Sequence, residues 1–364
     1  MHRRDALDAS VWWPIVQRHW MPDNSSVQDD PILAAGEHRG RAVEAKILRL
    51  LRGLTVSGLT ALEFPLDDRA GALPDISQRI ESPEQAEWLA RRMRPGQAQR
   101  LLQSWADARR RLESASGRPG TAVDLLGRIP SLWLEFDLRR QDEPEPLSCL
   151  RLPPESGELS RWIEAAFGPR GGENGWRKTL ERCRKALPRQ SRALYLFDLS
   201  PRQAGCVRLE IFGIPTLEVA EYLGQIGVSA PVHLDRIANC LAACERPHLS
   251  FDISPQGEIS DRFGLEVSFQ RLPSREAGWR RLFERLCAEG LCQNEVAEFF
   301  FSWQGQDRPR AAGDQWPTHP TLKRGHFVRV ASHVKVVLMG RKPPSAKGYL
   351  LFQYLASKKS ELSI

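Results

Sequence analysis

Short runs in which hydrophobic and polar residues alternate come in pairs along this chain. Two examples are SLWLEFDL (131–138) with LSCLRL (147–152), and ALYLFDLS (193–200) with CVRLEIFGI (206–214). A period of two indicates β-strands with one apolar face. A stretch with helical periodicity follows each of the first four pairs; the first of these stretches starts with Ser82 as N-cap and Pro83 at the first helical position. The pattern therefore predicts repeated strand–strand–helix units.

Five such units cover most of the chain. The other pairs are TALEFPLDD (60–68) with PDISQRI (74–80), HLSFDIS (248–254) with FGLEVSFQRL (263–272), and SHVKVVLMG (332–340) with AKGYLLFQYL (346–355), the last joined by a predicted turn, RKPPS. Predicted helices follow at 82–93, 97–113, 158–168, 215–227, 275–290 and 294–303, and AVEAKILRLLRGL predicts a helix that ends at Gly53. We expect an N-terminal helix and loop (1–40), one repeat domain (41–355) and a tail (356–364).

One face of the predicted strands is apolar and the other carries charges, hydroxyls and rings. In SLWLEFD, for example, Leu132, Leu134 and Phe136 oppose Trp133 and Glu135. The amphipathic helices need the apolar face, which leaves the polar face to water or to an enclosed space. An open sheet of ten strands would expose two edges, whereas a closed barrel exposes none and is wide enough for a polar, ligand-holding lumen. The pattern favours the α+β fold class, as a ten-stranded antiparallel β-barrel of ββα repeats surrounded by helices.

Composition narrows the function classes. The chain has 364 residues and a net charge of +7, but only nine of its 52 basic residues are lysine, and acidic residues are interspersed throughout. Charge is therefore weak support for nucleic-acid binding, and arginine runs such as RRMRPGQAQR are expected to be solvated helix faces. Seven cysteines do not suggest a disulfide scaffold. There is no membrane-length apolar run and no signal sequence, so we expect a cytoplasmic protein. Walker, GxGxxG, HExxH and GxSxG motifs are also missing.

This arrangement resembles the ABBA-type prenyltransferases, also called PT barrels, over residues 41–355. The resemblance rests on sequential ββα units, such as those containing LEFPLD, LEFDL, LFDLS and SFDIS, and on the polar lumen face. It implies transfer of a prenyl group from an allylic diphosphate to an acceptor, with donor binding by Arg, Lys and Tyr side chains on inner strands. Within the family, this chain most resembles the enzymes that act on peptides and indoles. No resident cofactor is expected, and Mg²⁺ accompanying the diphosphate is left open; no metal-ligand residues are predicted.

The resemblance also implies roles for individual residues. The candidate diphosphate ligands on the lumen face are Arg79, Arg208, Lys335, Lys347 and Tyr349. Glu63 lies on the first strand, where the family's indole and peptide enzymes have an acceptor-contacting glutamate, and is the candidate catalytic base. Candidate acceptor or lumen groups are Trp133, Glu135, Glu210, Phe212, His248, Glu266 and His333. The alternative is a purely structural role for these residues. Glu63 would then pair with Arg79 across the hairpin, and Lys335 and Lys347 would be charges at the rim of the barrel.

The predicted lumen face departs from the family in its charge. Glu63, Glu135, Asp137, Glu210, Asp252 and Glu266 outnumber the basic candidates, and Arg208-Leu-Glu210 stands where the family often has Lys-x-Tyr. An acidic majority binds diphosphate poorly unless some acids are paired or the acceptor is basic. Two functions therefore stay open. One is a prenyltransferase acting on an aromatic or basic side chain of a peptide or on a small aromatic acceptor. The other is a non-catalytic, peptide-binding accessory protein of a modified-peptide pathway.

Overall fold

A computed structural model gives the fold of the chain, and it describes residues 13–20, 47–48, 50–51, 54, 58–67, 74–93, 96–115, 132–138, 146–152, 175–242, 244, 247–309 and 325–356. The strands are β1 (Thr60–Pro65), β2 (Asp75–Ile80), β3 (Leu132–Phe136), β4 (Leu147–Arg151), β5 (Arg192–Asp198), β6 (Val207–Phe212), β7 (His248–Ile253), β8 (Ile259–Val267), β9 (Gly305–Asp307), β10 (Gly325–Met339) and β11 (Lys342–Ala356). The helices are α1 (Trp13–Trp20), α3 (Pro83–Ala90), α4 (Gln97–Ala115), α7 (Gly175–Lys185), α8 (Val219–Gln225), α9 (Leu234–Leu241), α10 (Ala277–Ala288) and α11 (Asn294–Ser302).

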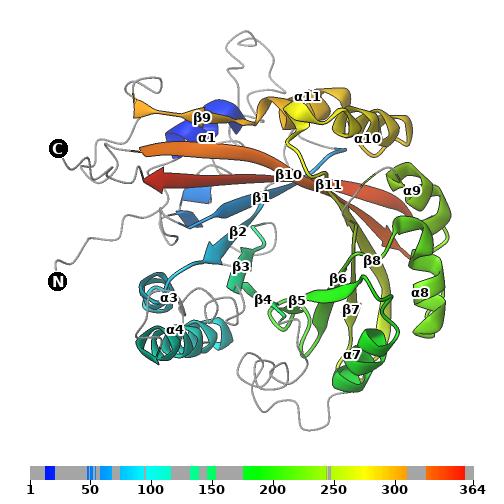
Figure 1. Cartoon of the computed structure of the whole chain (residues 1–364), viewed down its shortest axis with the longest axis horizontal. Helices are drawn as coiled ribbons and strands as arrows, with labels where there is room; N and C mark the ends of the chain where they lie inside the picture. Colours follow the sequence, from blue (N-terminus) through cyan, green and yellow to red (C-terminus); the bar gives the residue numbers. More distant parts are fainter. Residues whose placement is uncertain are drawn as a thin grey trace, which may run out of the picture.

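The strands close into a barrel. Strands β1 to β8 follow one another in chain order, β10 pairs with β8, β11 pairs with β10, and β1 pairs back with β11. All of these pairings are antiparallel, and the short β9 adds to β10 outside the ring. Figure 1 looks into the barrel, with the helices arranged around it. The expected ten-stranded antiparallel barrel is therefore confirmed, and closure leaves none of the ten strands as an open sheet edge.

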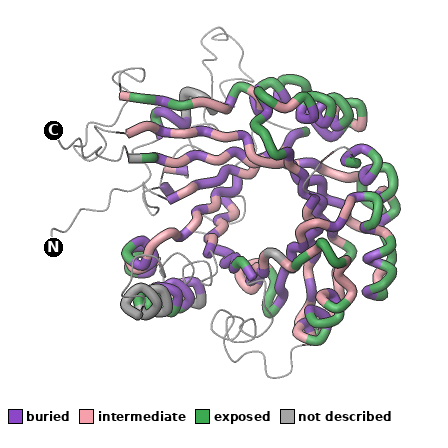
Figure 2. Tube along the Cα trace, viewed as in Figure 1, coloured by how far each residue is buried: buried purple, intermediate pink, exposed green. Residues whose placement is uncertain are grey.

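The apolar face of each strand lies outward, under the helices. Leu134, Leu209, Phe251, Leu265 and Val336 are each at most 1 % exposed and belong to one continuous hydrophobic core. The helices contribute large rings to the same core, and their other faces are exposed to solvent (Figure 2). This agrees with the two-residue alternation of the sequence, because residues two apart in a strand point to the same side of the sheet.

Local signals also place the helix ends. The Ser82 hydroxyl accepts a hydrogen bond from the backbone N–H of Gln85, and Pro83 opens α3, as predicted. The helix expected before β1 is described at Ile47, Leu48, Leu50 and Leu51. The helix expected at 158–168 lies outside the described residues. The basic, amphipathic α7, which precedes β5, is an element that the sequence analysis did not predict.

The predicted RKPPS turn is wrong. The turn between β10 and β11 consists of Gly340 and Arg341, and the next residues, including Pro343 and Pro344, already belong to β11. Proline lacks an N–H and is tolerated where a strand lacks a second partner. The prolines meet this condition, because pairing of β1 with β11 starts only at Lys347.

Among the described residues, no helix is both long and apolar enough to cross a membrane.

Candidate functional site

The polar strand faces enclose a cavity of about 600 Å³ inside the barrel. Most of the sequence-predicted site residues line it: Glu63, Trp133, Glu135, Arg208, Glu210, Phe212, His248, Glu266, His333, Lys335 and Tyr349. Arg79 and Lys347 do not line it directly. Lys347 forms an ion pair with Glu63, which does line the cavity. Arg79 Nε donates a hydrogen bond of 3.0 Å to Glu81. The tertiary structure therefore brings together residues that are spread over nearly 290 positions of sequence.

Glu63 is the centre of one polar cluster. The Lys347 ammonium donates to one of its carboxylate oxygens and the Tyr349 hydroxyl to the other. Burial alone would raise the pKa of Glu63, but the charges of Lys347 and Lys335 and the two hydrogen bonds outweigh burial and hold that pKa far below the usual range. Arg79, the alternative partner suggested by the sequence, pairs with Glu81 instead. Glu63 is therefore an ionised carboxylate with both oxygens already engaged.

A second cluster joins β8 and β10. The Lys335 ammonium donates to Glu266 Oε1 at 2.5 Å, and His333 Nε2 lies 3.6 Å from Glu266 Oε2. Burial would raise the pKa of Glu266, but Lys335 and the two nearby histidines lower it to about 2. Burial lowers the pKa of His333 to about 4, and its ring stacks on Tyr349 with 3.9 Å between centroids. Lys335 and Glu266 are therefore a buried ion pair rather than rim charges.

Three more ion pairs lie toward the end of the barrel where turns join β5 to β6 and β7 to β8. Arg208 makes a two-point contact with Asp252, at 2.6 Å from Nε and 3.1 Å from the terminal nitrogen. Arg262 approaches the same carboxylate at 3.7 Å. Arg202 donates to Glu135 at 2.7 Å. Together with the two clusters above, these contacts give every predicted diphosphate ligand a carboxylate partner.

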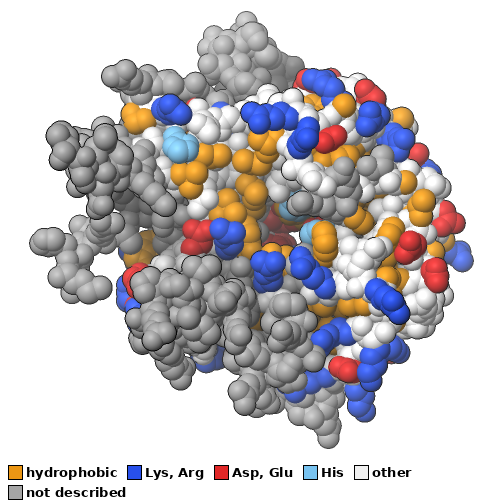
Figure 3. Space-filling view, in the orientation of Figure 1, with side chains coloured by type: hydrophobic (Ala, Val, Ile, Leu, Met, Phe, Trp, Pro, Cys, Tyr) orange, Lys and Arg blue, Asp and Glu red, His pale blue; other side chains and the backbone are white. Residues whose placement is uncertain are grey.

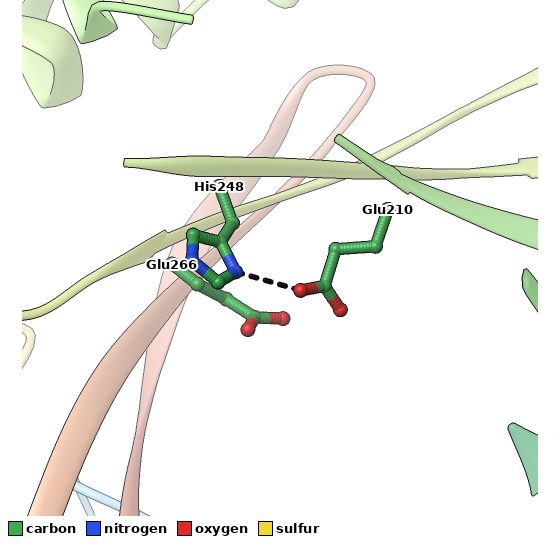
Figure 4. A group of neighbouring side chains, drawn as sticks. All are labelled: Glu210, His248 and Glu266. Carbon is green, nitrogen blue, oxygen red and sulfur yellow. Dashed lines mark hydrogen bonds and ion pairs between the residues drawn. The ribbon is translucent and has the colours of Figure 1, made fainter. Parts of the chain in front are cut away.

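A third cluster lies on β6 and β7 (Figure 4). His248 Nδ1 lies 2.6 Å from Glu210 Oε1, and the His248 ring meets Phe212 edge to face with centroids 5.1 Å apart. Burial and the charge of Glu266 raise the pKa of Glu210. Burial alone would lower the pKa of His248, but the hydrogen bond and charge of Glu210 outweigh it and raise that pKa. The two groups therefore hold a proton between them more firmly than either would alone.

The third cluster also bears on metal binding. Glu210, His248 and Glu266 each offer one ligand atom within 4.8 Å of the others, the one such grouping in the part of the chain that the structure describes. However, the Lys335 ammonium sits on Glu266 and repels a second cation at this point. A divalent ion at this donor set would therefore have to compete with the Lys335 ammonium.

Three arginines at the cavity mouth differ from the basic residues inside it. These mouth arginines, Arg151, Arg192 and Arg271, line the cavity, are exposed, and have no ion-pair partner among the described residues. Arg151 ends β4, Arg192 starts β5, and Arg271 follows β8, so antiparallel pairing places them at one end of the barrel. Figure 3 shows basic side chains beside the central hollow, with acidic and histidine side chains visible within it. The mouth is therefore basic, while the interior is internally neutralised.

Aromatic side chains share this cavity. Trp133, Tyr195, Phe197 and Phe212 all line it. The Arg192 guanidinium lies over the Phe212 ring, 5.3 Å from the centroid. Aromatic faces stabilise nearby cations through their quadrupole. The lining therefore combines exposed arginines, which can bind an anion, with aromatic rings, which can stabilise a cation.

Comparison with known proteins finds similarity in structure alone. A scan of protein families and a search of curated proteins found no match. Among solved structures, the apo form of the prenyltransferase PriB covers 98 % of this chain and 99 % of its own at 12 % identity and a TM-score of 0.44. A PriB complex with product diphosphate has a TM-score of 0.42 at 12 % identity, and the match covers 94 % of this chain and 96 % of the PriB chain. The ternary complex of PriB with L-tryptophan and dimethylallyl thiolodiphosphate has a TM-score of 0.44 at 12 % identity, and the match covers 98 % of this chain and 99 % of the PriB chain.

The strand order settles the architecture independently of these scores. Ten antiparallel strands run sequentially round a closed ring, with the helices between successive hairpins packed outside and a polar cavity inside. The chain has the PT-barrel fold. Its lumen is charged but largely self-paired, and its mouth carries the unpaired basic groups.

Irregularities of the PT barrel explain which cavity residues the sequence analysis missed. Strict alternation would place Arg192 on the face opposite Tyr195, but a bulge between Ala193 and Tyr195 brings both to the cavity. Arg271 lies beyond the end of β8, where strand alternation no longer applies. Arg151 is the last residue of β4 and shares a face with Cys149, so the alternation rule could have found it.

Gly264 of the PT barrel makes room for Lys335. A Cβ at this position would lie 2.4 Å from Lys335 Cε and 2.5 Å from the Ser250 hydroxyl oxygen. We expect Gly264→Ala to destabilise the fold by about 2 kcal/mol, because the barrel wall must shift or the Lys335–Glu266 contact must break. Urea unfolding would measure this loss, with Gly224→Ala as the control, since a Cβ on Gly224 meets nothing within 4 Å. Equal stability of Gly264→Ala and the wild type would contradict the close packing.

Proposed function

We propose that this protein transfers an allylic prenyl group from its diphosphate to an aromatic or basic side chain of a peptide, or to a small aromatic acceptor. The observation that carries the proposal is the composition of one enclosed cavity. Unpaired arginines at its mouth suit a diphosphate, and the aromatic rings in its lining suit the allylic cation that forms when the diphosphate leaves. A volume of about 600 Å³ is adequate for a short prenyl donor with an acceptor side chain.

The proposal assigns the first contact with the donor to the mouth arginines. Lys335, Lys347 and Arg208 are each neutralised by a carboxylate, so using them would require breaking a buried ion pair. Arg151, Arg192 and Arg271 carry no such cost. The prenyl tail then lies against the aromatic side chains of the cavity wall, which include Trp133 and Phe212. Tyr349 and the paired cations form the wall below the diphosphate in this arrangement.

Donor binding tests the proposal. We expect dimethylallyl diphosphate to bind, and the double variant Arg151→Gln/Arg192→Gln to raise its Kd by about 100-fold, because each charge-assisted hydrogen bond contributes about 1.5 kcal/mol or more. Calorimetry at low and high salt would measure this, since the contribution of exposed arginines weakens with ionic strength. Arg281→Gln, on the exposed face of α10, is the matched control.

Product analysis completes the test. Wild-type protein is incubated with dimethylallyl or geranyl diphosphate and with L-tryptophan or peptides containing Trp, Tyr or Arg, with and without Mg²⁺. Mass spectrometry detects a product heavier by one prenyl group. If the wild-type protein neither binds nor turns over either donor, the proposal is refuted.

A non-catalytic peptide-binding barrel is the second candidate. It is favoured by the fact that each of Arg79, Arg208, Lys335, Lys347 and Tyr349 contacts a carboxylate. In that case the paired charges would form the polar wall of a peptide-binding cavity and would not bind a diphosphate. Peptide binding in the absence of any donor binding would support this function over prenyl transfer.

A further inference from the structure

Prenyl transfer needs a group that takes up the acceptor's proton, and the geometry makes Glu63 a poor one. Both of its oxygens already accept hydrogen bonds, from Lys347 and Tyr349. These contacts, with the charge of Lys335, keep the pKa of Glu63 far below the usual range despite its burial. A general base works best when its pKa is near the working pH. Glu63 therefore fits the task of fixing Lys347 and Tyr349 better than that of accepting a proton.

The pair of His248 and Glu210 has the geometry that Glu63 lacks. Both side chains line the cavity, but Glu210 is 6 % exposed and His248 is 23 % exposed, so the imidazole is the more accessible of the two. Glu210 bonds the Nδ1 atom of His248 at 2.6 Å. The other ring nitrogen, Nε2, has no hydrogen-bond partner among the described residues. A carboxylate behind one imidazole nitrogen places the proton there and leaves the lone pair of the other nitrogen available.

The charged surroundings of His248 come from three further groups. Glu266, across from it on β8, favours the protonated imidazole, while Lys335 on β10 disfavours it. His333, also on β10, has a pKa lowered to about 4 by burial. On its own strand pair, the neighbours are Phe212 and Glu210. The sum of these influences raises the pKa of His248 above its ordinary value of about 6.5. Burial alone would lower this pKa, so the hydrogen bond and charge of Glu210 outweigh burial, and the imidazole binds a proton more firmly than a free imidazole does.

We propose that His248, oriented by Glu210, accepts the proton that the acceptor loses during prenyl transfer. The C–O bond of the donor breaks and its electron pair leaves with the diphosphate. The acceptor atom then forms a bond to C1 of the allylic cation, and its proton passes to His248 Nε2. This inference rests on the proposed function and names the residue that completes the reaction. His248 is the catalytic base, and Glu210 is a positioning residue.

The test separates the acceptor's proton loss from donor cleavage. Using dimethylallyl diphosphate with L-tryptophan or a Trp-containing peptide, we expect His248→Gln to lower prenyl transfer by about 100-fold or more. Hydrolysis of the donor without acceptor should stay within about threefold, because water that traps the cation loses its proton to solvent. His233→Gln, before α9 and with no side-chain capping bond, is the control and should leave both rates unchanged.

The role of Glu210 is tested by a pH profile. Wild-type transfer should fall as the pH drops through the pKa of His248, and Glu210→Gln should move this acidic limb to lower pH. Titration of the histidine ring signals by NMR, assigned with His248→Gln, should show the same downward shift without any substrate. A purely structural Glu210 would lower the rate but leave the limb in place. Glu284→Gln, exposed on α10, is the matched control.

Several outcomes would overturn the inference. Unchanged transfer in His248→Gln would exclude this histidine, and a selective loss of transfer in Glu63→Gln instead would assign the base to Glu63. Parallel loss of donor hydrolysis and transfer in His248→Gln would show a structural role. Those results would leave the proposed function intact. Failure of the wild-type protein to bind or cleave any donor would refute the proposed function, and this inference with it.

Discussion

Lys335→Met is expected to destabilise the protein by about 4 kcal/mol, since breaking a buried ion pair by removing one partner leaves the other charge without compensation. The ammonium of Lys335 is 2.5 Å from Glu266, and the two side chains are 8 % and 10 % exposed. In the variant, the Glu266 carboxylate keeps two histidines as nearby cation sources, His333 at 3.6 Å and His248. Equilibrium unfolding in urea at pH 7 measures the loss.

A second substitution distinguishes the ion pair from simple packing. Lys335→Met combined with Glu266→Gln should recover about half of the lost stability or more, because the stranded charge is gone. Lys342→Met, on an exposed position of the same hairpin, should change stability by less than about 0.5 kcal/mol. If the double variant is as unstable as Lys335→Met alone, the cost lies in packing rather than in the charge on Glu266.

Glu63→Gln is expected to cost about 3 kcal/mol at pH 7 and much less in acid. The pKa of Glu63 is lowered in the folded protein, so the ionised carboxylate stabilises the fold above the unfolded pKa of about 4.3. This contribution disappears as the pH falls below that value toward the folded pKa. The free energies of unfolding of wild type and Glu63→Gln should therefore converge between about pH 5 and pH 2.

Other lumen groups shape the same pH curve. Glu266, with its pKa lowered to about 2, loses its contribution over a similar acidic range. His333, with a pKa lowered to about 4, makes unfolding easier below about pH 6.5, because the unfolded chain takes up its proton first. The raised pKa values of His248 and Glu210 act in the opposite direction, stabilising the fold at low pH and less so as the pH rises. Variants of these residues would separate the contributions.

Circular dichroism during urea unfolding, repeated from pH 7 to pH 3, tests the Glu63 prediction. Glu284→Gln serves as the control, because it makes the same chemical change at a side chain exposed on α10. A constant difference between Glu63→Gln and wild type at all pH values would show that shape, rather than ionisation, makes Glu63 important. Tyr349→Phe, which removes one donor to Glu63, should give a smaller effect in the same direction.

The pairing of charges inside the lumen affects which ligand the lumen can bind. Counted along the sequence, Glu63, Glu135, Glu210 and Glu266 make the lumen acidic and unsuited to a diphosphate. In the folded protein, Glu63, Glu135 and Glu266 each hold a basic partner, and Glu210 holds His248. The accessible charge at the mouth is instead basic. The location of unpaired groups, rather than the number of charges, therefore decides which ligand the cavity favours.

Much of the fold follows from the sequence because it depends on local and periodic signals. Two-residue alternation in strands such as SLWLEFDL determined which residues face the helices and which face inward. The predicted inward residues, among them Trp133, Glu210 and His248, do line the cavity. The N-cap at Ser82 was likewise visible, because its hydrogen bond spans only three residues.

Other features required the tertiary structure, because they depend on contacts between distant strands or on irregular backbone. The partner of Glu63 is one: Lys347 and Tyr349 lie 284 and 286 positions away and meet it only because β1 pairs with β11. The bulge that brings Arg192 to the cavity is another, since alternation fails where one residue is added. The sequence by itself determined the face on which the polar groups of the regular strands lie. Closure of the barrel decided which of those groups neutralise one another and which stay available to a ligand.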